Sequence, residues 1–279
     1  MNAVPRRIQR VLAGISLPVY LLLYAPLSVI AIFSFAPSLG HPGPNVAAYG
    51  LLLNDPQVLA ALRRSLTLAI GSAILGTMLG TLMGFGLSRF RPAKGGGFWL
   101  GTLPSLIIYL PIIMPSLVFG ISELIFFNFV HEYTGLLSAG LLTMGIAHVT
   151  FQAPYVALVV YARLAGLDPN LFEASQDLYA NAVKSFVFLT IPVVRPALIG
   201  GFLLAITLSI DDFTISFFTA GPGSVTLPIY IYSAIARKGS SPEINALGSL
   251  MIATVIGVAL LYYFVTRHRE RGNRIPAVA

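Results

Sequence analysis

The chain has 279 residues, of which 56% are hydrophobic and only 10% are charged, and its mean hydropathy is +0.84. Soluble domains carry about 25% charged residues, so this chain has too few charges to cover a surface that faces water. The composition therefore argues against a soluble enzyme, a disordered tail and a coiled coil, and it places most of the chain in lipid. Cysteine is absent and the four histidines lie far apart in the sequence, which leaves no thiol nucleophile and no metal-ligand spacing.

Six stretches of the sequence are long and apolar enough to cross a bilayer as helices. Such a helix needs about 20 mostly apolar residues, because the hydrocarbon core is about 30 Å thick and a helix rises about 1.5 Å per residue. The stretches are residues 11–35, 65–87, 98–129, 136–162, 196–219 and 246–266. Since each span must satisfy its own backbone in lipid, we expect an all-α membrane protein of six transmembrane helices in a single domain, residues 1–279. The first stretch is too long for the core of a signal peptide, so we expect it to be retained.

Lys and Arg residues gather in the segments that lie inside if the N-terminus is cytoplasmic. These inner segments hold 13 of the 17 basic residues, namely Arg6, Arg7, Arg10, Arg89, Arg91, Lys94, Arg163, Lys184, Arg195, Arg267, Arg269, Arg271 and Arg274. The outer loops hold Arg63, Arg64, Arg237 and Lys238. Because cytoplasmic loops are rich in Lys and Arg, the bias predicts that both termini are cytoplasmic. The net charge of +7 is therefore mostly a topology signal, and no nucleic acid is needed to explain it.

Glycine and proline recur inside two of the predicted spans. The second span carries Gly76, Gly80 and Gly84 at a spacing of four, and the third contains Pro104, Pro111 and Pro115. A glycine stripe lets another backbone approach closely, so we expect it to pack helices, with the lining of a conduit as the alternative. Prolines remove helical hydrogen bonds, so the third span is predicted to be broken or kinked, either at a moving gate or for packing alone.

The inner segment between the fourth and fifth spans, residues 163–195, is longer than a simple connection needs. Asp168 followed by Pro169 is a helix start, because Asp accepts hydrogen bonds from a first turn and proline suits its first position. Glu173 and Asp177 are four residues apart and share one face. A partial apolar face is expected from Leu171, Leu178 and Ala182. The segment therefore predicts a short amphipathic helix, and its acidic face favours a cytoplasmic protein partner over an interfacial helix on anionic lipid.

This segment resembles the cytoplasmic "EAA" loop of ABC importer permeases. The resemblance is carried by Glu173-Ala174-Ser175, Asp177-Leu178, Ala180 and Ile191-Pro192. In that family the loop forms a coupling helix that docks in a groove on the ATPase subunit. Tyr179 stands near the place where the family usually has glycine. The resemblance implies coupling to an ATPase through Glu173, Ala174, Ser175, Asp177, Leu178, Tyr179, Ala180 and Pro192.

The C-terminal part resembles the second permease subunit of spermidine/putrescine-type importers. The matching runs are Ser209-Ile-Asp211-Asp212-Phe213, Gly221-Pro222-Gly223, Thr226-Leu227-Pro228, Ile231-Tyr232-Ser233 and Ser241 to Leu247. The resemblance implies a type I ABC importer permease core in a bacterial inner membrane. The implied partners are two ATPase subunits, a second permease subunit in a heterodimer, and a periplasmic substrate-binding protein.

Acidic residues lie within apolar spans, where an ionised carboxylate usually faces a cavity or a partner. Asp211 and Asp212 fall in the outer half of the fifth span, and Glu123 falls at a similar depth late in the third. A polyamine carries ammonium groups along a flexible chain, which suits separated carboxylates and aromatic faces such as Tyr109 and Phe213. We therefore take these five residues as the candidate substrate path. The alternative for the aspartates is a structural pair with Arg or Lys on another helix, or an N-terminal helix position in a broken span. On one continuous helix the two aspartates would point about 100° apart, so both cannot face one point.

Two further features concern the fourth span and the longest outer segment. His148 and Gln152 are polar residues within the fourth span, and we expect them to make hydrogen bonds between helices rather than to contact substrate. The outer segment 221–245 is predicted to be a loop with a short helix at Leu227–Ala236. This loop would contact the delivering binding protein or cap the path, with a plain surface loop as the alternative.

The chain has no phosphate-binding loop of the GxxxxGK[ST] type and no catalytic constellation. ATP and Mg²⁺ are therefore expected on partner ATPase subunits, with no cofactor or metal in this chain, which is not an enzyme by itself. The predicted function is that of a permease subunit of an ATP-driven importer for putrescine, spermidine or related amines, working by alternating access. The alternatives are an importer of an amino-acid- or opine-like substrate, and an ion-coupled secondary transporter with Asp211 and Asp212 as its ion site.

Overall fold

The computed structural model describes residues 6–36, 46–89, 98–168, 170–239 and 241–272, and all the regular secondary structure in these ranges is helical. The α-helices are α1 (Arg6–Phe33), α2 (Ala47–Leu53), α3 (Pro56–Arg89), α4 (Phe98–Ile113), α5 (Ser116–Thr134), α6 (Leu141–Ala165), α7 (Asn170–Asp177), α8 (Ala182–Lys184), α9 (Ile191–Ile210), α10 (Thr214–Thr219), α11 (Leu227–Lys238) and α12 (Pro242–Gly272). A π-helix, η1 (Ser185–Thr190), joins α8 to α9. The chain divides into two compact units, residues 60–230 and residues 1–59 with 231–279.

Four helical segments among the described residues are long and apolar enough to cross a membrane. They are Gly14–Phe33, Pro56–Ser88, Leu141–Ala165 and Ala182–Ile210, and the last of these includes α8, η1 and α9. The bent pair of α4 and α5 makes a fifth if it is counted as one span. The sixth predicted stretch, 246–266, lies in α12, where the apolar part recognised among the described residues is the shorter Pro242–Gly257. The count of six spans therefore stays a prediction.

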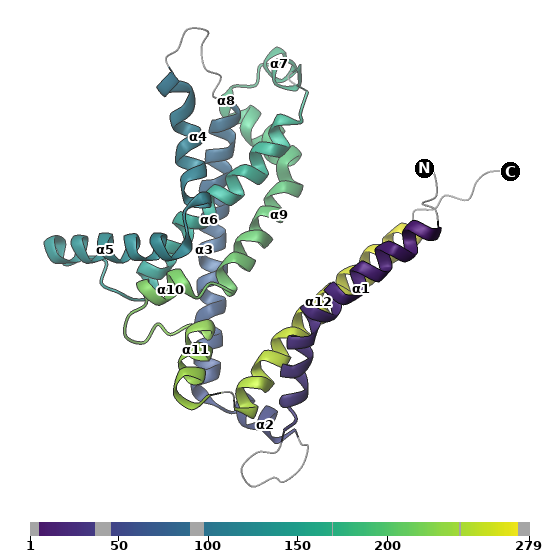
Figure 1. Cartoon of the computed structure of the whole chain (residues 1–279). Coiled ribbons are helices and arrows are strands. Elements are labelled where there is room, and N and C mark those ends of the chain that lie inside the picture. Colours follow the sequence, from purple (N-terminus) through teal and green to yellow (C-terminus); the bar gives the residue numbers. More distant parts are fainter. Residues whose placement is uncertain (1–5, 37–45, 90–97, 169, 240, 273–279) are drawn as a thin grey trace. The chain divides into compact units, whose positions relative to one another are not determined.

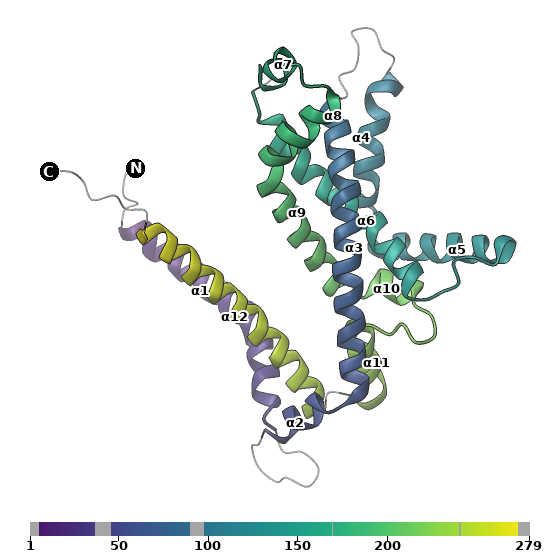
Figure 2. The same ribbon diagram turned by 180° about the vertical axis from the view of Figure 1, so that it is seen from behind.

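In the unit formed by residues 1–59 and 231–279, α1 and α12 lie side by side along most of their length (Figures 1 and 2). The short helix α2 packs against α12. The hydroxyl of Tyr49 on α2 lies 2.7 Å from the Oγ of Ser34 and 2.7 Å from the Oγ of Ser249 on α12. Because polar groups in lipid need partners, these hydrogen bonds fasten the C-terminal end of α1 and the N-terminal part of α12 to α2.

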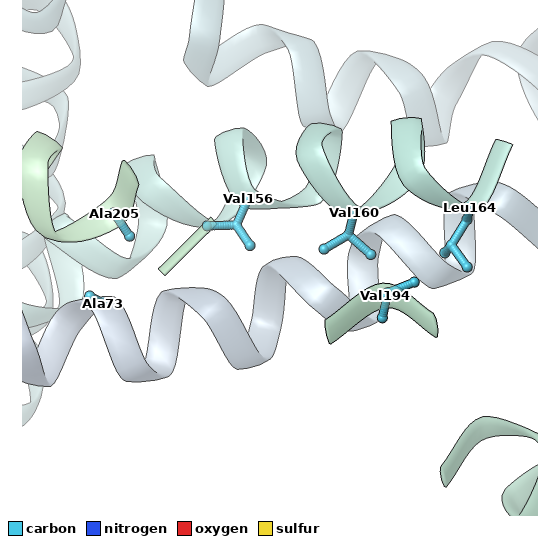
Figure 3. Packing of buried hydrophobic residues seen from close by; sticks show 6 residues of the cluster. All are labelled: Ala73, Val156, Val160, Leu164, Val194 and Ala205. Carbon is cyan, nitrogen blue, oxygen red and sulfur yellow. The ribbon is translucent and has the colours of Figure 1, made fainter. Parts of the chain in front are cut away.

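In the unit formed by residues 60–230, α6 is the central helix. It packs against α4, α9 and α10, and 67% of its most apolar 18-residue stretch is buried inside the protein. One core cluster joins α3, α6 and α9 (Figure 3). Its buried members are Ala73, Val156, Val160, Leu164, Val194 and Ala205. These small and branched side chains fill the space between the three helices, and helices in membranes associate mainly through such close packing.

The glycine stripe of the second predicted span packs α3 against α6. A Cβ atom on Gly80 would lie 2.6 Å from the carbonyl oxygen of Ala153 and 2.7 Å from the Cβ of Val156. A Cβ on Gly84 would lie 2.6 Å from the carbonyl oxygen of Ala157. These distances are shorter than van der Waals contact, so only glycine lets the two backbones approach this closely. The stripe therefore serves helix packing, as expected.

Replacement of Gly80 by alanine is expected to lower the thermal unfolding midpoint of the purified chain. The new methyl group must displace the α6 backbone, and overpacking of this kind costs about 1–3 kcal/mol. Gly86→Ala is the matched control, since no atom lies within 4 Å of its added Cβ and alanine favours a helix. Thermal denaturation in detergent measures both variants, and equal midpoints would contradict the packing role of Gly80.

The third predicted span, 98–129, is not one helix. It is broken between α4 and α5, which are bent by 110°. Pro115 sits at the break with extended backbone dihedrals (φ −56°, ψ 134°), and its carbonyl oxygen accepts from the N–H of Phe119 at 3.0 Å. Proline has no N–H to continue α4 and forces the preceding residue, Met114, away from helical geometry. The predicted kink is therefore a sharp break at the third proline, while α4 continues through Pro111.

Candidate functional site

The acidic helix expected in the inner segment is α7. An Oδ1 of Asp168 accepts from the backbone N–H of Asn170 at 3.0 Å, so the aspartate begins the helix as predicted. Pro169 lies outside the described residues. Glu173 is in the first turn, where a negative charge is favourable to the helix dipole. The side chains of Glu173 and Asp177 are both exposed, so α7 presents its acids to whatever covers it.

The turn that ends α7 is a left-handed cap of the Schellman type. The N–H of Ala180 donates to the carbonyl of Ser175 at 3.1 Å, and the N–H of Tyr179 donates to the carbonyl of Gln176 at 2.8 Å. This pair of bonds requires the residue before Ala180 to adopt a left-handed backbone, and Tyr179 has a φ of +57°. Glycine is the usual residue at such a position. Tyr179 therefore keeps the turn that glycine would form with less strain.

The two side chains that directly follow α7 are highly exposed in this chain. The predicted apolar face is wrong in part, because α7 ends at Asp177 and both Leu178 and Ala182 lie beyond it. Leu178 is 81% exposed and Tyr179 is 93% exposed. Large apolar side chains this exposed, next to an acidic helix, form a surface suited to a protein partner.

The helix α7 is connected to η1, the helical turn that precedes α9. The hydroxyl of Ser175 on α7 lies 2.9 Å from the hydroxyl of Ser185, the first residue of η1. Asn181 begins α8 by accepting from the N–H of Lys184 at 2.9 Å. Phe186 in η1 packs edge-on against Phe85 of α3, with ring centroids 4.8 Å apart. The segment that contains α7 is therefore joined to η1, which leads into α9, both by the chain and by this hydrogen bond.

Asp212 is engaged by the protein itself. Its Oδ1 accepts from the N–H of Ile215 at 3.3 Å and its Oδ2 from the N–H of Ser216 at 2.7 Å, so the carboxylate caps α10. The Nε2 of His148 lies 3.5 Å from the same Oδ2. The side chain of Asp212 is only 10% exposed. These contacts correspond to the structural alternative for Asp212 rather than to a free cation contact.

Asp211 is in a different position from its neighbour. The continuous helix expected over 196–219 is wrong here, because α9 ends at Ile210 and α10 begins at Thr214. Asp211 forms the C-terminal cap of α9, where its N–H donates to the carbonyl of Thr207 at 3.4 Å. Its side chain is exposed. The break therefore separates the two aspartates by role, with Asp212 directed into the protein and Asp211 left at the surface.

The other candidate path residues lie on different elements. Tyr109 is on α4 and is 41% exposed, and Glu123 is half-buried on α5. Phe213 lies at the break and stacks on Phe217, with ring centroids 5.3 Å apart. Within the described residues, no hydrogen bond or ion pair joins Tyr109 or Glu123 to either aspartate. Since α5, which carries Glu123, packs against α10, the common path of the five candidates stays a prediction.

His148 and Gln152 make the hydrogen bonds between helices that were expected of them. The Nδ1 of His148 lies 2.7 Å from the Oγ of Ser209 on α9, and its Nε2 lies 2.9 Å from the Oγ of Ser216 on α10. The amide nitrogen of Gln152 donates to the Oγ of Ser72 on α3 at 3.4 Å. The hydroxyl of Ser72 in turn donates to Ser209 at 3.4 Å. A buried polar network thus links α3, α6, α9 and α10.

The comparison with protein families decides the class of this chain. Residues 93–275 match the family described as the binding-protein-dependent transport system inner membrane component. The chain belongs to this family. The match covers α7, the Schellman turn and the broken fifth span, so the site described above lies inside the family's own region.

Curated relatives of this inner membrane component include two polyamine permeases of Escherichia coli (strain K12). The putrescine transport system permease protein PotI is 38% identical over 254 residues, which cover 89% of this chain and 88% of PotI. The spermidine/putrescine transport system permease protein PotC is 32% identical over 263 residues, which cover 93% of this chain and 95% of PotC. Both similarities extend over nearly the whole length of each protein.

Solved structures show the same fold. A chain of a bacterial ABC transporter involved in the import of the acidic polysaccharide alginate matches with a TM-score of 0.68 and 16% identity, covering 96% of this chain and 99% of that one. A chain of an amino acid ABC transporter matches with a TM-score of 0.52 and 19% identity, covering 80% and 99%. At these identities the likeness shows the fold alone. The inner membrane component has the fold of a type I ABC importer permease, as expected.

Sequence reasoning missed three serines of the site. Ser72, Ser209 and Ser216 are almost completely buried and complete the hydrogen bonds of His148 and Gln152. Serine is common in membrane helices and often bonds to its own backbone, so its presence alone carried no signal. The available signal was positional, since Ser209 and Ser216 flank the aspartate pair at a spacing of seven.

Replacement of Tyr179 by glycine is expected to stabilise the turn after α7 locally. A left-handed residue with a Cβ costs about 1–2 kcal/mol, and glycine removes that cost. Tyr179→Ala is the control, because alanine loses the same ring but keeps the Cβ. Hydrogen exchange at the Ala180 amide, the donor of the cap, measures the effect. Slower exchange is expected in the glycine variant alone, and equal exchange in both variants would contradict the strained turn.

Proposed function

We propose that this chain is a permease subunit of an ATP-driven importer that moves putrescine or spermidine across the inner membrane by alternating access. The observation that carries the proposal is its similarity, over about nine tenths of its length, to the polyamine permeases PotI and PotC. Family membership supports a role beside a binding protein and disfavours a secondary transporter that acts alone. The type I ABC importer fold agrees with this role.

The position of Asp211 supports a cationic substrate. Its carboxylate is exposed at the end of α9, whereas the carboxylate of Asp212 is occupied by the α10 cap and by His148. An ammonium group forms charge-assisted hydrogen bonds with a carboxylate, which are stronger than bonds between neutral groups. We therefore assign Asp211 as this chain's contact for one ammonium of the polyamine. Glu123 and Tyr109 stay candidates for a contact elsewhere along the path.

The partners follow from the same role. We infer a complex with two ATPase subunits, a second and different permease subunit, and a periplasmic substrate-binding protein. ATP and Mg²⁺ would bind the ATPase subunits, and both termini of this chain would be cytoplasmic. The exposed acids of α7 with Leu178 and Tyr179 supply the docking surface for one ATPase.

The contacts of α7 suggest how ATP drives transport. ATP binding would close the ATPase dimer and move α7, and the Ser175–Ser185 hydrogen bond with the chain itself would carry that movement into η1 and α9. Since Asp211 caps the far end of α9, its exposure to either side would change with that helix. Hydrolysis would restore the inward-facing state.

The test is the ATPase activity of the assembled importer in proteoliposomes with its binding protein. The proposal predicts stimulation by putrescine or spermidine, and none by an amino acid or an acidic oligosaccharide. Stimulation by an amino-acid- or opine-like compound alone would overturn the polyamine assignment and leave the importer class intact. Failure of any ATPase subunit to associate with this chain would overturn the proposed role in an ATP-driven importer. The ion-coupled secondary transporter would then be the favoured hypothesis.

A further inference from the structure

The break between α9 and α10 leaves backbone groups that lipid cannot satisfy. Helices in a bilayer must find internal partners for every freed N–H and C=O. Here the carboxylate of Asp212 accepts hydrogen bonds from N–H groups in the first turn of α10, from Ile215 at 3.3 Å and from Ser216 at 2.7 Å. Asp212 therefore satisfies these N–H groups at the break. It directly precedes α10 in the sequence, however, and its bonds to Ile215 and Ser216 do not connect α10 to α9.

His148 is the side chain that connects the two sides of the break. It comes from α6 and is fully buried. Its Nδ1 lies 2.7 Å from Ser209, one residue before the last residue of α9, and its Nε2 lies 2.9 Å from Ser216 in α10. Nε2 also lies 3.5 Å from the Asp212 carboxylate. The two nitrogens flank the Cε1 carbon of a rigid planar ring and point in different directions, so the ring holds the two helix segments at a fixed separation.

The surroundings of His148 keep the ring in place. Its ring packs edge-on against Phe151 of the same helix, with centroids 5.6 Å apart. Ser209 receives a second hydrogen bond, from Ser72 on α3 at 3.4 Å. On α5, a Cβ atom added to Gly120 would lie 3.4 Å from the Cα of Ile215. This close packing of α5 restricts the movement of α10. The ring therefore has little freedom to leave the position that joins α9 to α10.

We propose that His148 is a positioning residue that clamps the two halves of the broken fifth span and thereby fixes where Asp211 stands. Asp211 lies between Ser209 and Ser216, the two hydroxyls that the ring contacts. This inference rests on the proposed function only in taking Asp211 as the ammonium contact. The clamp itself is a property of the fold and is measurable without any substrate.

Amide side chains divide the clamp into its two halves. An asparagine at position 148 places its amide near the place of Nδ1 and can keep Ser209, while a glutamine reaches toward the place of Nε2 and can keep Ser216. His148→Ala loses both contacts. His131→Ala is the matched control, because His131 is an exposed histidine on α5 outside the clamp. The three variants at position 148 therefore release α9, α10 or both.

The first readout is the separation of α9 and α10 in the assembled importer. The chain has no cysteine, so spin labels can be placed at Leu203→Cys on α9 and Phe217→Cys on α10, which are 57% and 48% exposed. A narrow distance distribution is expected with His148 and with His131→Ala. A broad one is expected with His148→Ala, and intermediate widths with the asparagine and glutamine variants.

The second readout is polyamine uptake by the same variants without labels. If His148 positions Asp211, His148→Ala raises the half-saturating polyamine concentration about tenfold, while the maximal rate falls less. A purely structural defect would lower the maximal rate through loss of active molecules and leave the half-saturating concentration unchanged. Recovery toward the native value is expected in the asparagine or glutamine variant.

The outcomes separate the clamp from the proposed function. A native distance distribution and a native half-saturating concentration in His148→Ala would overturn the clamp. If His148→Ala does not assemble, the asparagine and glutamine variants decide, and native behaviour of both in the two readouts would overturn it equally. If the native importer moves no polyamine at all, the proposed function fails, and the distance distributions still test the clamp.

Discussion

Replacement of Asp211 by asparagine is expected to raise the half-saturating polyamine concentration about tenfold or more in the assembled importer. A hydrogen bond to a charged group contributes about 1.5–3 kcal/mol, and each 1.4 kcal/mol corresponds to about tenfold in affinity. The exposed position of Asp211 keeps the expected effect toward the lower end of that range, because solvent screens the pair. Uptake of labelled putrescine into proteoliposomes as a function of concentration measures it.

Asp212→Asn is the matched variant for this experiment. Asparagine caps a helix about as well as aspartate and keeps one acceptor oxygen, so the shorter bond from the N–H of Ser216 is expected to survive, while the longer one from Ile215 is lost. The half-saturating concentration should therefore change much less than in Asp211→Asn. The opposite order, with Asp212→Asn more severe while the complex still assembles, would show that the buried aspartate is the cation contact and that Asp211 is not.

Replacement of Glu173 by alanine is expected to uncouple ATP hydrolysis from transport, with uptake reduced about tenfold or more. Glu173 is an exposed carboxylate in the first turn of α7, so its removal leaves the fold of the spans intact and alters only the docking surface. Charged pairs desolvated at a protein interface typically cost about 2–5 kcal/mol when one partner is truncated. The measurement compares ATPase activity and uptake in the same proteoliposomes.

The control for Glu173 lies on the same helix. Gln176 is exposed in α7 and lies outside the residues that resemble the coupling loop, so Gln176→Ala should transport at nearly the native rate. Substrate binding by the assembled complex should be unchanged in both variants. Equal and near-native uptake in both would remove α7 from the coupling path, and the docking surface would have to be sought elsewhere on the chain.

The sequence predicted best the features that follow from hydropathy, helical periodicity and proline chemistry. Hydropathy located the long helices, and the spacing of Gly76, Gly80 and Gly84 predicted a packing stripe because helical periodicity places those residues on one face. Proline chemistry predicted a kink in the third span, and the structure places the break at Pro115. These features follow from local rules that act the same way in any helical bundle.

From the sequence, a break in the fifth span was an alternative and not the main prediction. The residues Ile210 to Phe213 contain neither proline nor glycine, so the only local signal of a break is the preference of aspartate for a helix start. A group from elsewhere in the chain, His148 on α6, contacts both sides of the break. The sequence predicted that the two aspartates point in different directions, and the structure shows that the side chain of Asp212 is buried while that of Asp211 is exposed.

Tyr179 shows a related limit. The residue type argued for a change in the turn after α7, since the resembling loops usually have glycine there. The hydrogen bonds of Ala180 and Tyr179 nevertheless form the same left-handed cap, at the expense of a φ of +57° in a non-glycine residue. Backbone geometry here follows from the helix end and its bonding partners more than from the side chain that occupies the position.

We infer that this chain forms part of a polyamine path driven by ATP on partner subunits. The most direct test is the uptake of labelled putrescine and spermidine into proteoliposomes that contain the assembled importer, its binding protein and ATP. We expect uptake to need both ATP and the binding protein. In Asp211→Asn, we expect the uptake rate at low substrate concentration to fall about tenfold. Uptake that persists without ATP, or an importer that moves another ligand and no polyamine, would contradict it.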